Sequence, residues 1–306
     1  MSVQTSPSAR EVAHAASLSP SRAADFKTCP LLYRFRAIDR IPERPTPDQV
    51  RGTLVHAVLE RLFDLPSASR TKDEAAALVR PQWERLLAER SELTDLFTVA
   101  DDLQPETPGP APADPAQGEA ALLDSATRLL DGYFAVEDPR RVEPAERECL
   151  VEAVVDEHLL LRGYIDRLDV SVDGDLRVVD YKTGGAPREA FEARALFQLK
   201  FYALVLWRTR GVVPKVLRLV YLGDREVCDY APEPEELVRF ERTLLALWRA
   251  IERSTMERDF RPRPSRLCGW CGHHSRCPAY GGTLPPFPEP VPADDVADEP
   301  VPATDV

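Results

Sequence analysis

The 306-residue sequence predicts a mixed α/β domain with additional helices, and three patterns lead to that class. Apolar residues recur with helical spacing through the first third of the chain. After about residue 146 they alternate at every second position, as in half-buried strands. A helical pattern near 188–210, strand patterns near 215–222 and 226–230, and a long helical pattern near 233–257 then follow in that order.

Four helices are expected before the first strand. The first begins at Ser19, a residue type that caps helix N-termini, with Pro20 in its first turn. The second covers 49–63 and carries an apolar stripe on one face. Two more are expected over about 73–90 and 120–135.

The stretch 164–182 alternates most clearly. Its even positions carry the apolar residues Tyr164, Leu168, Val170, Val172, Leu176 and Val178. The odd positions on both sides of the turn are polar, so Arg167 and Asp169 are expected to face solvent. Gly174 marks a hairpin turn, because glycine adopts positive φ readily.

Three charged residues, Asp166, Asp180 and Lys182, interrupt the even, apolar positions. A two-residue turn would place the two aspartates on opposite faces, whereas an odd-numbered loop places all three charges on the apolar face. Burial of that face favours the odd loop. Such charges are costly to desolvate unless they are paired or bind a metal. A structural Asp–Lys ion pair and a Mg²⁺ or Mn²⁺ site both fit this pattern.

The hairpin contains two characteristic segments, Gly163-Tyr-Ile-Asp166-Arg-Leu-Asp and Val179-Asp180-Tyr-Lys182-Thr-Gly184. Arg51-Gly-Thr-Leu-Val-His56 lies upstream, and Gln198-Leu-Lys-Phe-Tyr202 lies downstream. In this order, over about residues 18–280, the segments resemble the PD-(D/E)xK nuclease superfamily. They resemble most closely its RecB-type exonucleases and their CRISPR-associated iron–sulfur relatives. The resemblance implies a restriction-endonuclease-like mixed sheet flanked by helices.

The resemblance also implies roles for residues at the matching positions. Asp166 and Asp180 would bind the catalytic Mg²⁺ or Mn²⁺, and His56 would be an additional metal ligand. Lys182 would be the catalytic lysine, which helps a water molecule attack the scissile phosphate.

Two further parts of the site follow from the same resemblance. Members often carry another metal-binding carboxylate on the preceding strand, for which Glu148 is the candidate and Glu146 and Glu152 are alternatives. Gln198 and Tyr202 lie four residues apart and so face the same side of a helix. They would orient the lysine or contact DNA, although ordinary helix packing would give the same spacing.

Three cysteines have a C-x2-C-x5-C spacing, namely Cys268, Cys271 and Cys277. Cys29, far upstream, is the natural fourth ligand for a four-coordinate site. Zinc and an iron–sulfur cluster both accept four thiolates, and His273 or His274 would alternatively complete a Cys₃His zinc site. The resemblance implies a [4Fe–4S] cluster that staples the N-terminal helices to the C-terminal region.

Taken as a total, the net charge of −12 argues against a nucleic-acid partner. Most of it, however, belongs to two Pro-rich acidic segments with the composition of disordered chain, which carry −5 and −6 and leave −1 for the remainder. The chain is expected to divide into six regions. They are a disordered leader at 1–17, a helical region with Cys29 and His56 at 18–99, an acidic linker at 100–119, a nuclease core at 120–262, an iron–sulfur cysteine region at 263–282 and a disordered acidic tail at 283–306.

These features together predict a metal-dependent DNA exonuclease that acts on single-stranded DNA in repair or recombination. A catalytically silent iron–sulfur scaffold that binds DNA or a helicase partner is one alternative, and a nuclease of CRISPR spacer acquisition is another. The sequence has no membrane-spanning apolar run and no signal peptide, which predicts a cytoplasmic protein. Basic and aromatic residues expected to line the DNA path are Arg34, Arg36, Lys200, Tyr202 and Arg208.

Overall fold

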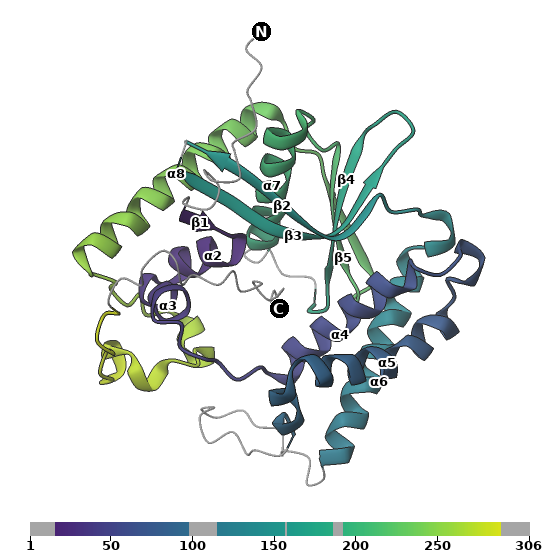
Figure 1. Cartoon of the computed structure of the whole chain (residues 1–306), viewed down its shortest axis with the longest axis horizontal. Helices are drawn as coiled ribbons and strands as arrows, with labels where there is room; N and C mark the ends of the chain where they lie inside the picture. The colour runs from purple at the N-terminus through teal and green to yellow at the C-terminus, as the bar shows by residue number, and fades with distance from the viewer. Residues whose placement is uncertain (1–15, 98–114, 157, 186–191, 289–306) are drawn as a thin grey trace.

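The computed structural model describes residues 16–97, 115–156, 158–185 and 192–288, which form a mixed six-stranded sheet with helices on both faces (Figure 1). Its strands are β1 (Ala16–Leu18), β2 (Glu146–Val155), β3 (Leu159–Val170), β4 (Leu176–Lys182), β5 (Val216–Tyr221) and β6 (Glu226–Tyr230). The order is β1–β3–β4–β5–β6, and β2 also pairs with β3. The β1–β3 and β4–β5 pairs are parallel and the others antiparallel, so the predicted mixed α/β class is confirmed.

The helices are α2 (Pro20–Thr28), α3 (Pro30–Tyr33), α4 (Pro47–Leu62), α5 (Lys72–Glu89), α6 (Pro115–Val136), α7 (Glu192–Arg210) and α8 (Pro234–Glu257). Ser19 caps α2 as expected, because its hydroxyl accepts a hydrogen bond from the N–H of Arg22 at 3.2 Å. Helix α6 begins earlier than predicted, so residues 115–119 are helical rather than part of the linker. Within the described ranges, no helix is both long and apolar enough to cross a bilayer.

Short helical segments also occur in the part of the chain that the structure describes. They are the π-helix η1 (Arg34–Ile38) and the 3₁₀ segments η2 (Ser67–Ser69), η3 (Ser91–Asp95), η4 (Pro139–Arg141), η5 (Arg266–Trp270), η6 (His274–Arg276) and η7 (Pro278–Tyr280). The last three contain the C-terminal cysteine region, which lies beside α2 and α3 (Figure 1). The two ends of the described chain therefore meet.

The β3–β4 hairpin has the odd-numbered loop that the apolar pattern predicts. Val170 pairs with Leu176, which leaves the five residues 171–175 in the turn, and Gly174 has a φ of +84°. The same register sets Asp166 opposite Asp180. One detail of the prediction is wrong, because Val172 lies fully exposed in the turn rather than on the buried strand face.

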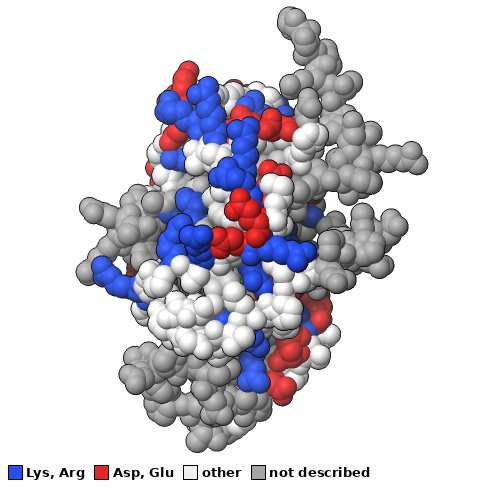
Figure 2. All heavy atoms as spheres, turned by 90° about the vertical axis from the view of Figure 1, so that its left-hand side faces the viewer, with Lys and Arg blue, Asp and Glu red and all other residues white. Residues whose placement is uncertain are grey.

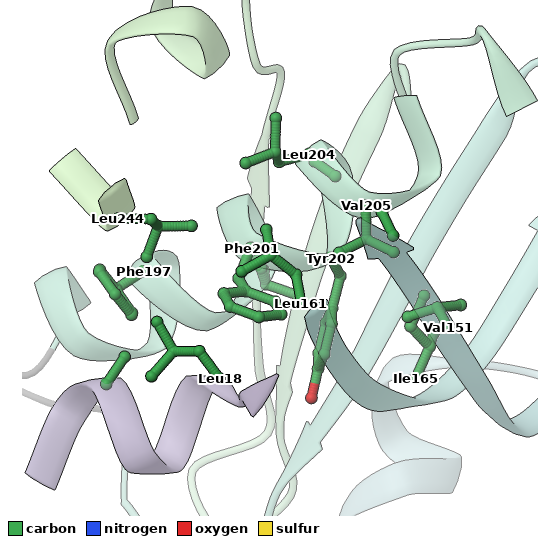
Figure 3. Packing of buried hydrophobic residues seen from close by; sticks show 14 of the residues in the cluster. Leu18, Val151, Leu161, Ile165, Phe197, Phe201, Tyr202, Leu204, Val205 and Leu244 are labelled. Carbon is green, nitrogen blue, oxygen red and sulfur yellow. The ribbon is translucent and has the colours of Figure 1, made fainter. Parts of the chain in front are cut away.

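Helices cover both faces of the sheet. Helix α7 packs on one face, and Figure 3 shows Phe197 and Phe201 of this helix packed with Leu244 of α8 and Leu161 of β3. Helices α4, α5 and α6 enclose a second core on the opposite face. Strand β4 contributes to both cores, because its even positions, such as Val178, belong to the first and its odd positions to the second.

The prediction that Arg167 and Asp169 face solvent is wrong. Their exposed fractions are 1% and 8%. Alternation of charged and apolar residues indicates a solvated face only when one side of the sheet is open. Here the α4–α6 layer covers the odd positions, so these charges are buried and paired.

Two predicted boundaries also differ from the structure. Ala16–Leu18 forms β1, so the end of the predicted leader is a strand of the sheet. Near the other end, Phe287 stacks on Phe260 with ring centroids 6.2 Å apart, so the start of the predicted tail is packed. Residues 1–15, 98–114 and 289–306, with the rest of the leader, linker and tail, lie outside the described residues.

Arg70 joins the end of α4 to the chain that enters β2. Its side chain is buried, and Nη2 donates to the carbonyl of Phe63 at 3.3 Å while Nη1 donates to that of Val142 at 2.7 Å. Helix α4 carries the candidate histidine and β2 carries the candidate glutamates. The Arg70 side chain therefore fixes the relative placement of two parts of the candidate site.

We predict that Arg70→Met lowers the free energy of unfolding by about 2–4 kcal/mol, because buried carbonyls then lose their donor. The matched control is Arg140→Met, which removes a solvent-exposed pair with Asp138 and should leave the free energy of unfolding close to that of the wild type. Urea denaturation measures both variants. If both variants lost the same small amount of unfolding free energy, Arg70 would not hold α4 to the sheet.

Candidate active site

The hairpin charges cluster near the end of β4. Lys182 Nζ lies 2.9 Å from Asp180 Oδ2, and both side chains are largely buried. On the neighbouring strand, Asp166 Oδ2 accepts a hydrogen bond from the main-chain N–H of Tyr181 at 2.7 Å. The three residues that interrupt the apolar pattern are thus brought together.

Helix α4 adds His56 to this cluster. Its Nε2 lies 3.0 Å from the main-chain oxygen of Tyr181, which makes Nε2 the protonated donor when the ring is neutral. Nδ1 then faces Asp166 Oδ1 at 3.6 Å and Glu148 Oε1 at 3.8 Å. Both distances are too long for hydrogen bonds, and this buried nitrogen has no hydrogen-bond partner in the structure.

Of the three glutamates that the sequence leaves open on β2, Glu148 is the one beside His56. Glu146 instead pairs with Arg210 at 2.6 Å, and Glu152 pairs with Arg162 at 3.4 Å. Glu148 has a φ of +42°, a left-handed conformation that is unfavourable for a residue with a side chain. Alternation alone could not identify it, because all three glutamates occupy positions of the same parity.

Burial and mutual charge shift the pKa values in this cluster. Burial raises the pKa of Glu148, more than the neighbouring His56 lowers it. Burial alone would lower the pKa of His56, but the Asp166 and Glu148 carboxylates raise it well above its ordinary value. Burial would likewise raise the pKa of Asp166, yet the charge of His56 and the Tyr181 N–H lower it. The cluster thus stabilises a cation between two carboxylates.

These donors fit a hard divalent cation. Among the described residues, His56, Glu148 and Asp166 form the group of metal-binding side chains whose ligand atoms lie within 4.8 Å of one another. One imidazole and two carboxylates suit Mn²⁺ or Mg²⁺. Asp180 is outside this group, since its carboxylate is directed to Lys182. The main-chain hydrogen bond of Nε2 is the outer-shell contact typical of a histidine that binds metal through Nδ1.

Helix α7 supplies a hydrogen-bonded series that ends at the lysine. Lys182 Nζ donates to Gln198 Oε1 at 2.7 Å, and Gln198 Nε2 donates to the Tyr202 hydroxyl at 3.0 Å. Tyr202 approaches β3 closely where Gly163 has no side chain. Figure 3 shows the Tyr202 ring directed from α7 toward the strands. The expected grouping of Gln198 and Tyr202 with the lysine is therefore present in the structure.

The four candidate cluster cysteines lie on two segments that contact each other. The Sγ of Cys29 accepts a hydrogen bond from the N–H of Arg263 at 3.3 Å. Burial raises the pKa of the Cys271 thiol, and the nearby Cys268 and Cys29 thiols raise it further. No three of the described thiols have sulfurs within 4.8 Å of one another. The cysteines are thus neighbours without forming a compact cluster.

The residues expected to line a DNA path are mostly neutralised by carboxylates. Arg34 is buried and pairs with Asp39, so its assignment to a DNA-contacting surface is wrong. Tyr202 is buried. The remaining three residues form the ion pairs Arg36–Glu43, Lys200–Glu236 and Arg208–Glu241. Composition alone could not reveal this, because it does not show which carboxylate each basic side chain meets: Glu43 lies seven residues from Arg36, whereas Glu241 lies 33 residues from Arg208.

Comparison with known proteins gives one family and several relatives. The family model described as PD-(D/E)XK nuclease superfamily matches residues 17–278. The chain is 28% identical to the gene 69 protein of Mycobacterium phage D29 and 32% identical to that of Mycobacterium phage L5, in both cases over 86% of this chain and 96% of the relative. A crystal structure of a candidate exonuclease from Eubacterium rectale is similar with a TM-score of 0.49 and 10% identity, covering 96% of this chain and 99% of that one.

We predict that Gly163→Ala displaces the Tyr202 ring, because the added Cβ would lie 2.8 Å from Tyr202 Cε1. The free energy of unfolding should fall by about 1–2 kcal/mol. In a Tyr202→Leu background the same change should cost less, with a coupling of about 1 kcal/mol in a double-mutant cycle. Gly269→Ala, where an added Cβ meets nothing within 4 Å, is the control. If the two substitutions changed the free energy of unfolding additively, the close approach of Gly163 and Tyr202 would be contradicted.

Proposed function

The chain belongs to the PD-(D/E)XK nuclease superfamily, and on that premise we propose that it is a metal-dependent exonuclease acting on single-stranded DNA. We place this activity in DNA repair or recombination in the cytoplasm. One observation carries the proposal. The unpartnered, buried Nδ1 of His56 faces the carboxylates of Asp166 and Glu148, one strand away from Lys182.

Each polar group then has a proposed role. His56, Glu148 and Asp166 would hold the metal, with Asp180 beside them on the neighbouring strand. A bound Mg²⁺ or Mn²⁺ would polarise the scissile phosphate and activate a water molecule. Asp180 and Gln198 restrain the Lys182 ammonium, whose positive charge would stabilise the negative charge that develops on the phosphate.

The presence of every group that the reaction needs argues against a catalytically silent scaffold. A silent member would be expected to lack an acidic ligand or the lysine. Here Asp166, Asp180 and Lys182 are present and hydrogen-bonded or ion-paired at one end of the hairpin. Helicase activity would have to come from a partner, since the sequence has no Gly-x-x-x-x-Gly-Lys-Ser/Thr phosphate loop.

Single-stranded DNA is favoured by the surface of the cysteine region. Trp270 is 80% exposed, and exposed aromatic rings stack on unpaired bases. Four exposed arginines in this part of the chain form no ion pair with a described carboxylate: Arg258, Arg263, Arg266 and Arg276. Figure 2, which views this side of the molecule, shows basic side chains interleaved with acidic ones above a largely uncharged area. This combination suits an unpaired, negatively charged strand.

We also propose a [4Fe–4S] cluster held by Cys29, Cys268, Cys271 and Cys277. The contact between Cys29 and Arg263 supports the proposal, because it holds the upstream cysteine against the C-terminal segment. Four sulfurs around zinc would lie about 3.8 Å apart, as follows from a Zn–S bond of about 2.3 Å. Among the described residues no three thiols lie that close together, so the cysteines do not form a preformed zinc site.

Anaerobically purified protein should show the broad visible absorption of thiolate-bound iron. Cys29→Ser should lose most of this absorption, because the upstream ligand is removed. Cys149→Ser, in β2, should retain it and serves as the control. A colourless protein that contains zinc and no iron would refute the cluster while leaving the nuclease proposal intact.

The wild-type protein should degrade linear single-stranded DNA with Mn²⁺, faster than duplex DNA, and leave circular single strands intact. Lys182→Ala should slow the reaction by about 10²–10³-fold, because a charge that stabilises the transition state is lost. Lys215→Ala is the matched control, since Lys215 pairs with Asp175 at the exposed turn of the hairpin. Gel assays with end-labelled strands measure all three proteins. Undiminished cleavage by Lys182→Ala would rule out the proposed mechanism.

A further inference from the structure

A network of buried charges lies on the face of the sheet opposite Lys182. At its centre is Arg167, whose exposed fraction is 1%. Its Nη1 and Nη2 donate to Glu137 Oε1 and Oε2 at 2.5 and 2.9 Å, a bidentate pair with the residue that follows α6. Nη2 also donates to Asp169 at 3.2 Å. The charge of this arginine is thus neutralised by two carboxylates.

Arg167 makes one further contact that stability alone does not require. Its Nη1 donates to the hydroxyl of Tyr181 at 2.7 Å. Arg167 follows Asp166 on β3, and Tyr181 lies between Asp180 and Lys182 on β4. The contact therefore links the two strands that carry the candidate catalytic residues.

Tyr181 connects this network to the metal site through its main chain. Its N–H donates to Asp166 Oδ2 at 2.7 Å, and its carbonyl lies 3.0 Å from His56 Nε2. Two of the three candidate metal ligands are therefore oriented by the peptide groups of one residue. The ring of that residue meets the His56 ring edge-on and is held by Arg167 and by an edge contact with Tyr133.

We propose that Arg167 and Tyr181 are positioning residues, which hold Asp166 and His56 in the orientation that binds the metal. This inference rests on the proposed metal site. When the Tyr181 phenol is held in place, the main chain of β4 is held at the same residue. The Tyr181 carbonyl accepts the hydrogen bond of His56 Nε2 and so leaves Nδ1 available as a ligand. Outer-shell contacts of this kind typically raise metal affinity by about 10–100-fold.

Ion pairing alone is a weaker explanation for the network. Buried ion pairs contribute little net stability compared with apolar residues of similar volume. Tyr133 allows the two roles to be separated, because it is also fully buried and its hydroxyl donates to the same Glu137 at 2.9 Å. Within the described residues, the Tyr133 hydroxyl makes no hydrogen bond with the Tyr181 main chain, which orients Asp166 and His56.

The test compares Tyr181→Phe with Tyr133→Phe, since each removes one buried hydroxyl from the same network. Arg167 itself is a poor choice, because its loss would leave the Glu137 and Asp169 charges buried and unpaired. Thermal unfolding should show similar losses of stability for the two variants. Titration with Mn²⁺ alone, followed by the electron paramagnetic resonance of the free ion, should show about tenfold weaker binding for Tyr181→Phe only.

Asp166→Ala shows whether the titration reports the proposed metal site. If this variant loses Mn²⁺ binding and Tyr181→Phe binds as tightly as the wild type, the positioning role is wrong and the metal site stands. Equal weakening in Tyr181→Phe and Tyr133→Phe would also overturn the positioning role, because general loosening would then explain it. If the wild type and Asp166→Ala bind equally, the metal site itself fails and the inference fails with it.

Discussion

Charged side chains must be accommodated inside a sheet that helices cover on both faces, and the rest of the structure depends on this constraint. An isolated buried charge is costly, so each one requires a partner. Lys182 pairs with Asp180 on the α7 face, while Arg167 pairs with Glu137 on the other. Successive residues of a strand point to opposite faces, so shifting β3 by one residue would turn Arg167 to the other face and separate it from Glu137. The register of the β3–β4 hairpin is therefore set by polar as well as apolar groups.

The remaining groups of the site come from helices that are fixed to this hairpin. Helix α4 brings His56, and Arg70 holds the end of that helix to the entrance of β2. Helix α7 connects the parallel strands β4 and β5 and brings Gln198 to the lysine. A metal site assembled from separate elements needs such supports, because small displacements of a ligand reduce both binding and catalysis.

Much of this arrangement could be predicted from the sequence because it depends on local periodicity. The alternation around Gly174 indicated an odd loop and therefore a shared face for Asp166 and Asp180, which agrees with the register of the hairpin. The burial of Arg167 could not be predicted in this way, because it depends on a helical layer from a distant part of the chain.

The same limit explains the other differences from expectation. Glu148 shares its parity with two other glutamates, so only the position of α4 distinguishes it. The basic residues expected on a DNA path are paired with carboxylates that composition does not identify, and for Lys200 the partner is Glu236 on another helix. Some of the surface arginines that form no ion pair with a described carboxylate lie instead in the cysteine region, such as Arg266 and Arg276.

The central claim is that His56 binds the catalytic metal through Nδ1 together with Asp166 and Glu148. Pulsed electron paramagnetic resonance of bound Mn²⁺ tests it most directly, because coupling to a directly bound imidazole nitrogen is resolved in the spectrum. The account predicts nitrogen coupling in the wild-type protein and its loss in His56→Gln, with Mn²⁺ still bound by the carboxylates at saturating metal. A wild-type spectrum without nitrogen coupling, or coupling that persists in His56→Gln, would contradict it.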